Sequence, residues 1–235
     1  VLELNPSESV KKMAIEKIAA RKADSSLPLL LTYLRESEDS IKEVIIRCLS
    51  NWESAAPLDA MLELAQTTNN DAIRRQALAG AIQLSENSVD LSPEKRAELF
   101  NNAINLAASP EVLKGVIGAL QNTSYPEALA VVVKFLDNEQ VKGEAEVATV
   151  KLAKALLGIA PDIVVAALKK VIAQSQMDLI KQEAQQTLEI LPKFEDFITA
   201  WMVSGPYTNE EINTNMLYEF SFPPEKPEEE AKVIW

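Results

Sequence analysis

No histidine occurs among the 235 residues, and Cys48 is the single cysteine. Histidine is the commonest general base in enzymes and the commonest zinc ligand, and one cysteine cannot form an intrachain disulfide. Within this chain, the composition therefore excludes a disulfide, a zinc site and a Ser-His or Cys-His nucleophilic pair. Cys48 stands in the apolar stretch 45–49, and we expect it to be a core residue rather than a redox group.

Motifs for binding phosphate, calcium or membranes are missing as well. The six glycines form neither a Gly-x-Gly-x-x-Gly nor a Gly-Lys-Ser/Thr loop, and none lies among the alternating oxygen ligands that calcium requires. No run of about eighteen apolar residues predicts a transmembrane helix, and no basic segment followed by an apolar stretch opens the chain as a signal peptide would. We therefore expect no catalytic, cofactor-binding or metal-binding residues.

The charge balance is acidic, with 23 basic residues against 35 acidic ones and a formal net charge of −12. An acidic surface repels a phosphate backbone, so a nucleic-acid partner is not expected. Basic pairs such as Arg74-Arg75 are scattered along the chain, as is typical of solvated helix faces. A groove that binds an acidic partner is the alternative, with Arg74 and Arg75 as its candidate interaction residues.

Aliphatic residues dominate what is present, because 47% of the chain is hydrophobic and only 6% is aromatic. Alanine and leucine enter helices at little entropic cost, so this composition favours helices. An apolar residue followed closely by a basic one recurs along the chain, with small or apolar residues four and eight positions later. This spacing places them on one helix face. The six anchors of the pattern are Val10, Ile41, Ile73, Val112, Val141 and Ile180.

A second helix is predicted after most of these helices, and it often opens with proline. Proline at the first helical position forfeits no hydrogen bond and already has a helical φ angle. The predicted openings are Pro28, Pro57, Pro93, Pro126 and Pro161. Two units are longer: in the third the extra residues fall in a loop at 85–92, and in the fifth the first helix extends over about 141–159. A single helix pair cannot bury both its faces, so the pairs are expected to stack into an α-solenoid.

Residues 70–81 and 180–188 carry the clearest copies of the pattern, an apolar residue followed by a basic one and by alanine at the fourth position. These copies resemble the start of a helix in HEAT repeats, and the resemblance covers about residues 7–191. It implies an all-α fold, with residues 1–192 forming a right-handed α-α superhelix of about 5–6 HEAT-like helical hairpins. The larger Ile45 and the polar Thr149 depart from the family pattern, so the choice between HEAT and armadillo repeats stays open.

The pattern changes after Pro192, and residues 193–235 are predicted to be an extended, β-like C-terminal segment. Trp201 and Val203 alternate as in a strand that ends at Gly205-Pro206, although a helix over 195–202 is the alternative. A linker rich in proline and acid fills 223–230, and 231–235 looks like half a strand. We therefore expect the chain to be a piece of a longer protein that ends just inside a β-rich domain.

Residues 201–207, 222–225 and 233–235 are similar to the segment that opens β-sandwich regions in large exported bacterial proteins. In those proteins, HEAT-like repeats accompany carbohydrate-active domains such as the keto-disaccharide hydrolase type. The resemblance implies a periplasmic or extracellular location and a carbohydrate ligand through the parent protein. Trp201 and Tyr207 are candidate interaction residues here. They either pack the C-terminal strand against the last helix pair or form a platform on which sugars stack.

Other conspicuous residues have structural interpretations. Carboxylate pairs such as Glu144/Glu146 are expected on solvated helix faces, not in a glycosidase-like cleft. Gly80, Gly115, Gly118 and Gly158 are expected to permit close helix packing or to mark helix ends, and the approach of a ligand is the alternative.

Two functions follow from the sequence. The first is a non-catalytic protein-interaction or scaffold module with a protein partner. The alternative is an accessory region of a larger exported, carbohydrate-active, glycoside-hydrolase-like enzyme whose active site lies outside these residues. The partner's identity and the oligomeric state stay open.

Overall fold

A computed structural model describes residues 7–88, 91–194, 222 and 225–226. The chain divides into two compact units, Val1–Glu195 and Asp196–Trp235. The described part of the first unit consists of α-helices, short 3-10 helices and turns, with no strand among those residues, so the prediction of an all-α fold is confirmed. The strands predicted around Trp201 and at Trp235 lie outside the described residues.

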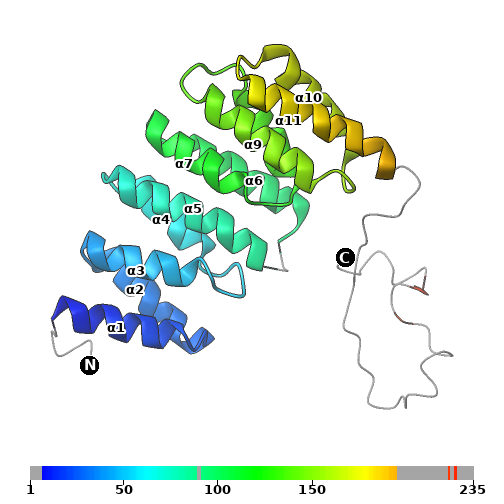
Figure 1. Cartoon of the computed structure of the whole chain (residues 1–235). Coiled ribbons are helices and arrows are strands. Elements are labelled where there is room, and N and C mark those ends of the chain that lie inside the picture. The colour runs from blue at the N-terminus through cyan, green and yellow to red at the C-terminus, as the bar shows by residue number, and fades with distance from the viewer. Residues whose placement is uncertain (1–6, 89–90, 195–221, 223–224, 227–235) are drawn as a thin grey trace. The chain divides into compact units, whose positions relative to one another are not determined.

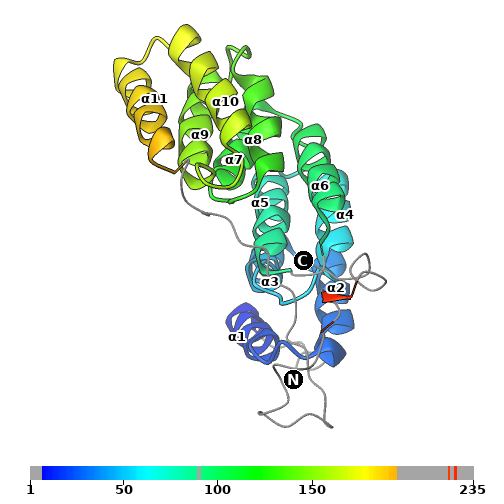
Figure 2. The same cartoon turned by 90° about the vertical axis from the view of Figure 1, so that its right-hand side faces the viewer.

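The helices of the first unit alternate between two layers, which we call A and B (Figures 1 and 2). The A layer contains α1 (Glu8–Ala19), α3 (Asp39–Leu49), α5 (Asp71–Asn87), α7 (Pro110–Leu120), α9 (Lys142–Ala155) and α11 (Asp178–Ile190). The B layer contains α2 (Leu27–Glu36), α4 (Leu58–Thr67), α6 (Pro93–Asn105), α8 (Pro126–Val132) and α10 (Pro161–Gln174). The 3-10 helices are η2 (Asp24–Ser26), η3 (Val133–Phe135) and η4 (Leu191–Phe194), so residues 193–194 continue the helical region instead of starting the extended segment.

Five helical hairpins and a final A-layer helix make one continuous stack. Consecutive A-layer helices pack on one another, and each B-layer helix packs against the A-layer helix that follows it. The contacts between neighbouring pairs bury one contiguous apolar core along the whole stack. This is the arrangement that a solenoid requires, because each pair covers the face that its neighbour exposes.

The face that the anchors share is the one expected to pack in the stack, and the four central anchors, Ile41, Ile73, Val112 and Val141, are buried accordingly. In α5, for example, Ile73, Ala77 and Ala81 have no exposed surface. The prediction for the first helix is wrong, because Val10 is 41% exposed, whereas Ile15 and Ala19 are buried. In the A layer, α1 has α3 as its neighbour on one side, so its buried face is narrower than those of the central helices and follows Ile15 and Ala19.

Several helix boundaries differ from the predicted ones. Pro57 is the N-cap of α4 instead of its first residue, and Pro110 opens α7 of the A layer. The extra residues of the third unit partly lengthen the helix, because α5 continues to Asn87. In the fifth unit α9 ends at Ala155, well before position 159. Leu156 leaves the helical conformation and is buried, so it contributes to the core instead of to a further helical turn.

Small and large core residues both shape the stack. A Cβ atom on Gly80 would lie 2.4 Å from Ser50 Oγ and 2.5 Å from Met61 Cε, so this glycine lets α5 approach α3 and α4 closely, as predicted. Trp52 is 2% exposed and belongs to the core. Cys48 is half-buried against the core, and burial raises the pKa of its thiol, which disfavours the reactive thiolate.

Candidate interaction surface of the A layer

Hydrogen bonds and ion pairs between polar side chains join successive helices of the A layer at several positions along the stack. Near the C-terminal ends, the amide of Gln83 on α5 donates to Asn51 Oδ1 beside α3 at 3.1 Å, and Lys151 on α9 donates to Asn122 Oδ1 after α7 at 2.6 Å. The outer helices are linked by ion pairs, Arg47 with Glu16 and Lys154 with Glu183. These contacts fix the spacing of neighbouring helices on the exposed face of the layer.

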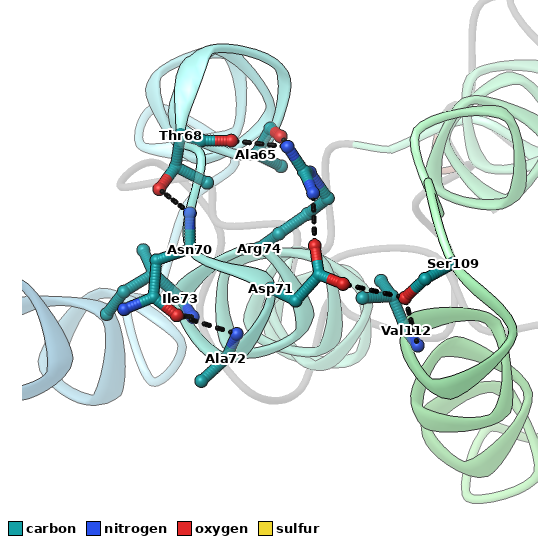
Figure 3. A network of polar contacts seen from close by, with 9 residues as sticks. All are labelled: Ala65, Thr68, Asn70, Asp71, Ala72, Ile73, Arg74, Ser109 and Val112. Carbon is teal, nitrogen blue, oxygen red and sulfur yellow. Dashed lines mark hydrogen bonds and ion pairs between the residues drawn. The ribbon is translucent and has the colours of Figure 1, made fainter.

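The N-terminal ends of the A-layer helices are joined in the same way. Asn70 Nδ2 donates to Asp39 Oδ2 at 2.7 Å, which links α5 to α3. Ser109 Oγ donates to Asp71 Oδ2 at 2.8 Å, which links α7 to α5. Asn70 and Ser109 are also N-caps that accept from backbone N–H groups of their own helices, so each side chain serves a helix end and a helix–helix contact together. Figure 3 shows both caps and the bond from Ser109 to Asp71.

Arg74 belongs to this network. Its guanidinium donates to the backbone carbonyls of Ala65 and Thr68 and pairs with the Asp71 carboxylate (Figure 3). The side chain thereby ties the end of α4 to the start of α5. Its donors are directed to groups of the chain itself, and this gives Arg74 a structural role in holding the turn.

A hollow of about 710 Å³ lies over the same edge of the layer, lined by Asp39, Lys42 and residues 67–71. The polar groups that line it already bind one another, because Asp39 accepts from Asn70, and Asp71 accepts from Arg74 and Ser109. We assign this hollow to the contacts that join the helices.

A second hollow of about 450 Å³, which we call the α5–α7 groove, runs between α5 and α7. Its walls are Ala79, Ile82, Gln83 and Glu86 of α5, with Gly115, Gly118, Ala119, Asn122 and Thr123 of α7 and the turn after it. Beyond the Ser109–Asp71 bond at the N-terminal ends of α5 and α7, no side-chain hydrogen bond among the described residues crosses the groove. Within the part of the chain that the structure describes, no hydrogen bond joins Gln83 to Asn122, because Gln83 donates to Asn51 and Asn122 binds Lys151 and the Gly118 carbonyl.

The groove is open because small residues occupy the positions that face it. A Cβ atom on Gly118 would meet nothing within 4 Å, so the prediction that Gly118 serves close helix packing is wrong. A Cβ atom on Gly115 would lie 2.5 Å from Arg75 Cγ and Cδ, so Gly115 provides the space in which the Arg75 side chain lies. The floor is apolar, with Ile82 fully buried and Ala79 and Ala119 partly so.

Opposite charges stand near the two ends of the groove, with Glu86 in its lining and Arg75 beside the lining residue Gly115. Arg75 lies over Gly115 at the N-terminal end, and its guanidinium makes no hydrogen bond or ion pair with any described residue. Glu86 lies at the C-terminal end of the groove. Its side chain is exposed to solvent, but partial desolvation by its neighbours raises the pKa of its carboxyl, although Arg96 and the Ser124 backbone N–H act in the opposite direction. The groove therefore has a cation, an apolar floor and a partly desolvated carboxyl in sequence along its length.

The Glu86 end of the groove adjoins a small polar cluster. The Arg96 guanidinium stacks on the Tyr125 ring with its central carbon 3.6 Å from the ring centroid, and it donates to the Leu91 carbonyl at 3.0 Å. Burial raises the pKa of the Tyr125 hydroxyl, and the charges of Glu86 and Glu127 reinforce this shift. The cluster connects Leu91, just before α6, to Tyr125 at the start of α8.

The carboxylate pair Glu144/Glu146 requires a correction. Glu144 is on the surface as predicted, but Glu146 is 2% exposed. Its Oε2 atom accepts from Ser175 Oγ at 2.7 Å, and Ser175 Oγ accepts in turn from the Met177 N–H at 3.1 Å. Glu146 thus holds the link between α10 and α11. Its position on a helix shared with exposed glutamate and lysine gave no sequence signal of burial.

The described residues contain no group of three or more His, Cys, Asp and Glu side chains that could hold a metal ion. None of the described helices combines the length and the apolar composition needed to cross a membrane. What the α5–α7 groove offers is an apolar surface with charges at its ends, which suits binding more than bond making.

Comparison with known proteins agrees with this architecture. A family model described as HEAT repeats matches residues 1–82, which include α1 to α4 and most of α5. The chain is a HEAT-like helical repeat protein. No curated protein and no solved structure matches it. In this HEAT-like protein the later hairpins continue the two-layer alternation of the matched part without a break (Figure 1).

The candidate residues from the sequence fall in three places in this HEAT-like protein. Arg75 lies at the groove, and Arg74, one residue earlier, is engaged at the turn between α4 and α5. Trp201 and Tyr207 lie outside the described residues. Three groove residues, Glu86, Gln83 and Ala79, were not predicted from the sequence. Their sequence signal is limited to the small residues Ala79, Gly115 and Gly118, which by themselves do not distinguish a groove from close packing.

Proposed function

We propose that the solenoid is a non-catalytic protein-interaction module that binds a partner on its A layer. The stacked HEAT-like architecture supports the proposal, since such repeats provide extended binding surfaces. The observation that carries it is the α5–α7 groove, a hollow of about 450 Å³ across which no described side chains bind one another, although contacts such as Gln83–Asn51 and Lys151–Asn122 join the neighbouring helices at the same end of the layer.

A displayed library of random peptides, selected against the folded 235-residue chain, tests this proposal. We expect enriched peptides that bind with one peptide per chain in titration calorimetry and that do not bind the urea-unfolded chain. Selection that yields only peptides with equal affinity for the folded and unfolded chains would overturn the proposal.

The alternative, an accessory role in an exported carbohydrate-active protein, stays a prediction. It depends mainly on Trp201, Tyr207 and the terminal residues, which lie outside the described part of the chain. A glycan array probed with the chain and with its Trp201→Ala variant tests it. Binding of a defined glycan by the chain and its loss in the variant would favour this alternative. Equal signals from the two proteins would count against it.

A further inference from the structure

We infer that the α5–α7 groove binds an extended segment of a partner protein, about four or five residues long, with an acidic side chain at the Arg75 end and a basic side chain at the Glu86 end. This inference rests on the proposed function and specifies its site and the chemistry of its partner.

The dimensions of the groove select an extended segment. Its lining runs over residues 115–123 of α7 and the turn after it, which span about 12 Å at a rise of 1.5 Å per residue. A volume of about 450 Å³ over that length gives a mean cross-section of about 40 Å², whereas a helix about 10–12 Å in diameter needs about twice that or more. An extended chain at about 3.3 Å per residue places about four residues in the same length.

The lining also suits a peptide backbone. Gly118 and Ala119 on α7 and Ala79 on α5 let a main chain approach the floor closely. On the rim, the amide nitrogen of Gln83 donates to Asn51, and its Oε1 atom has no partner among the described residues. This oxygen can accept a hydrogen bond from a backbone N–H of an extended segment. The backbone N–H groups within a helix are already paired.

The charges fix the order of side chains on the bound segment. Arg75 and Glu86 are eleven residues apart on α5, which is about 16 Å along the helix axis and about five residues of extended chain. Arg75 offers its guanidinium to a carboxylate, since it pairs with no described residue. Glu86 stands in the last turn of α5, where the helix dipole favours a cation and disfavours a carboxylate.

Glu86 is also short of compensating charge within the protein. Arg96 is the cation near it, but its guanidinium is directed to the Tyr125 ring and the Leu91 carbonyl and makes no ion pair with Glu86 within 4.0 Å. A lysine or arginine of the partner would therefore meet an exposed carboxylate that partial desolvation and the helix dipole both disfavour. A basic side chain at this end is favoured over an acidic or an apolar one.

Four variants of the 235-residue chain test the inference, with the same peptide library as probe. Gly118→Trp fills the groove from a position with open space around it. Ala130→Trp places the same side chain at an exposed alanine on α8 of the B layer. Arg75→Glu reverses the charge at one end of the groove, and Lys169→Glu makes the same change at an exposed lysine on α10. Melting curves and circular dichroism confirm that each variant is folded before binding is measured.

Peptides selected on the unmodified chain are expected to carry an acidic and a basic residue about five positions apart. Gly118→Trp should weaken their binding about tenfold or more, and Ala130→Trp should leave it unchanged. Arg75→Glu should weaken binding about three- to tenfold, because the exposed ion pair between Arg75 and the acidic residue of the peptide becomes a repulsion. Lys169→Glu should leave binding unchanged. Selection on Arg75→Glu should enrich peptides with basic residues at both ends.

Equal binding by Gly118→Trp and the unmodified chain would overturn the inference while leaving the proposed function standing, because the peptides would then bind elsewhere on the chain. Weakening by Gly118→Trp without any charge preference, or selected sequences with helical spacing of apolar residues, would also overturn it. If no specific peptide is obtained, the proposed function fails together with the inference.

Discussion

Gly80 and Gly118 are both helical glycines of the A layer, and their surroundings differ completely. A methyl group added at Gly118 would have open space around it, whereas one added at Gly80 would lie within 2.5 Å of Ser50 Oγ and Met61 Cε. Gly118→Ala should therefore stabilise the fold by about 0.5–1 kcal/mol, the usual gain in helix propensity, and Gly80→Ala should destabilise it. Urea denaturation of the two variants measures both effects, and a loss of stability in Gly118→Ala would show that the groove is closed.

Glu86 makes stability depend on pH in a definite direction. Because burial raises the pKa of its carboxyl in the folded state, the unfolded chain ionises first as the pH rises from about 4, the ordinary range of glutamate. The folded state is then increasingly disfavoured up to the folded-state pKa and stays so above it. Arg96 and the Ser124 N–H reduce this cost without removing it.

Glu86→Gln should therefore be more stable than the unmodified chain near pH 7, with the difference vanishing as the pH falls to about 4. Thermal melts of both proteins over this range measure it. Asp137 gives the opposite control: hydrogen bonds from Lys170 and Gln174 lower the pKa of its carboxyl, so Asp137→Asn should lose stability at neutral pH and not in acid. A Glu86→Gln protein that is the less stable of the two near pH 7 would contradict this role of Glu86.

At the scale of the helix, Ser109 shows how caps also join repeats. Its hydroxyl oxygen accepts from the Val112 N–H at 3.4 Å, and its hydroxyl donates across to Asp71 on α5. Ser92 caps α6 in the same way, at 3.4 Å from the Lys95 N–H, without a bond to another helix among the described residues. Ser92→Ala should cost about 1 kcal/mol, and Ser109→Ala about 0.5–1 kcal/mol more.

Chemical denaturation of the two alanine variants gives this difference directly. An additional double variant, Ser109→Ala with Asp71→Asn, shows whether the extra cost belongs to the contact between α5 and α7, since the two changes should then be less than additive. Equal costs for Ser92→Ala and Ser109→Ala would mean that the bond between the helices contributes nothing to stability.

Burial could be predicted from the sequence for those residues that have the same neighbouring helices in every repeat. Ile41, Ile73, Val112 and Val141 occupy equivalent positions between two adjoining A-layer helices, so helical periodicity alone identifies their buried face. Val10 could not be placed this way, because α1 lacks one of those neighbours. The burial of Glu146 was not predicted for a different reason. Its buried carboxylate binds Ser175, which lies 29 residues later in the sequence, at the C-terminal end of α10.

The α5–α7 groove could not be predicted, since it depends on two helices at once. Gly118 and Ala79 each have an ordinary interpretation as small residues that permit close packing. Only the distance between α5 and α7 in the stack shows that the space beside Gly118 is empty. Arg75 was identified as a candidate from its charge, but its position over Gly115 and its opposition to Glu86 required the structure.

At the scale of the whole first unit, the groove stands near the middle of the stack, between the third and fourth hairpins. A solenoid transmits contacts mainly between neighbouring repeats, so a partner bound to α5 and α7 should affect these helices and leave the distant ones largely unchanged. The effect of a bound partner on local stability can therefore be measured separately for each helical hairpin along the chain.

Hydrogen exchange of the 235-residue chain, measured with and without a saturating library-selected peptide, tests most directly whether the α5–α7 groove is the binding site. We predict slower amide exchange in residues 75–87 and 115–123, with α1, α2, α10 and α11 unchanged. Slower exchange confined to the B-layer helices or to the ends of the stack, with residues 75–87 and 115–123 unchanged, would contradict it.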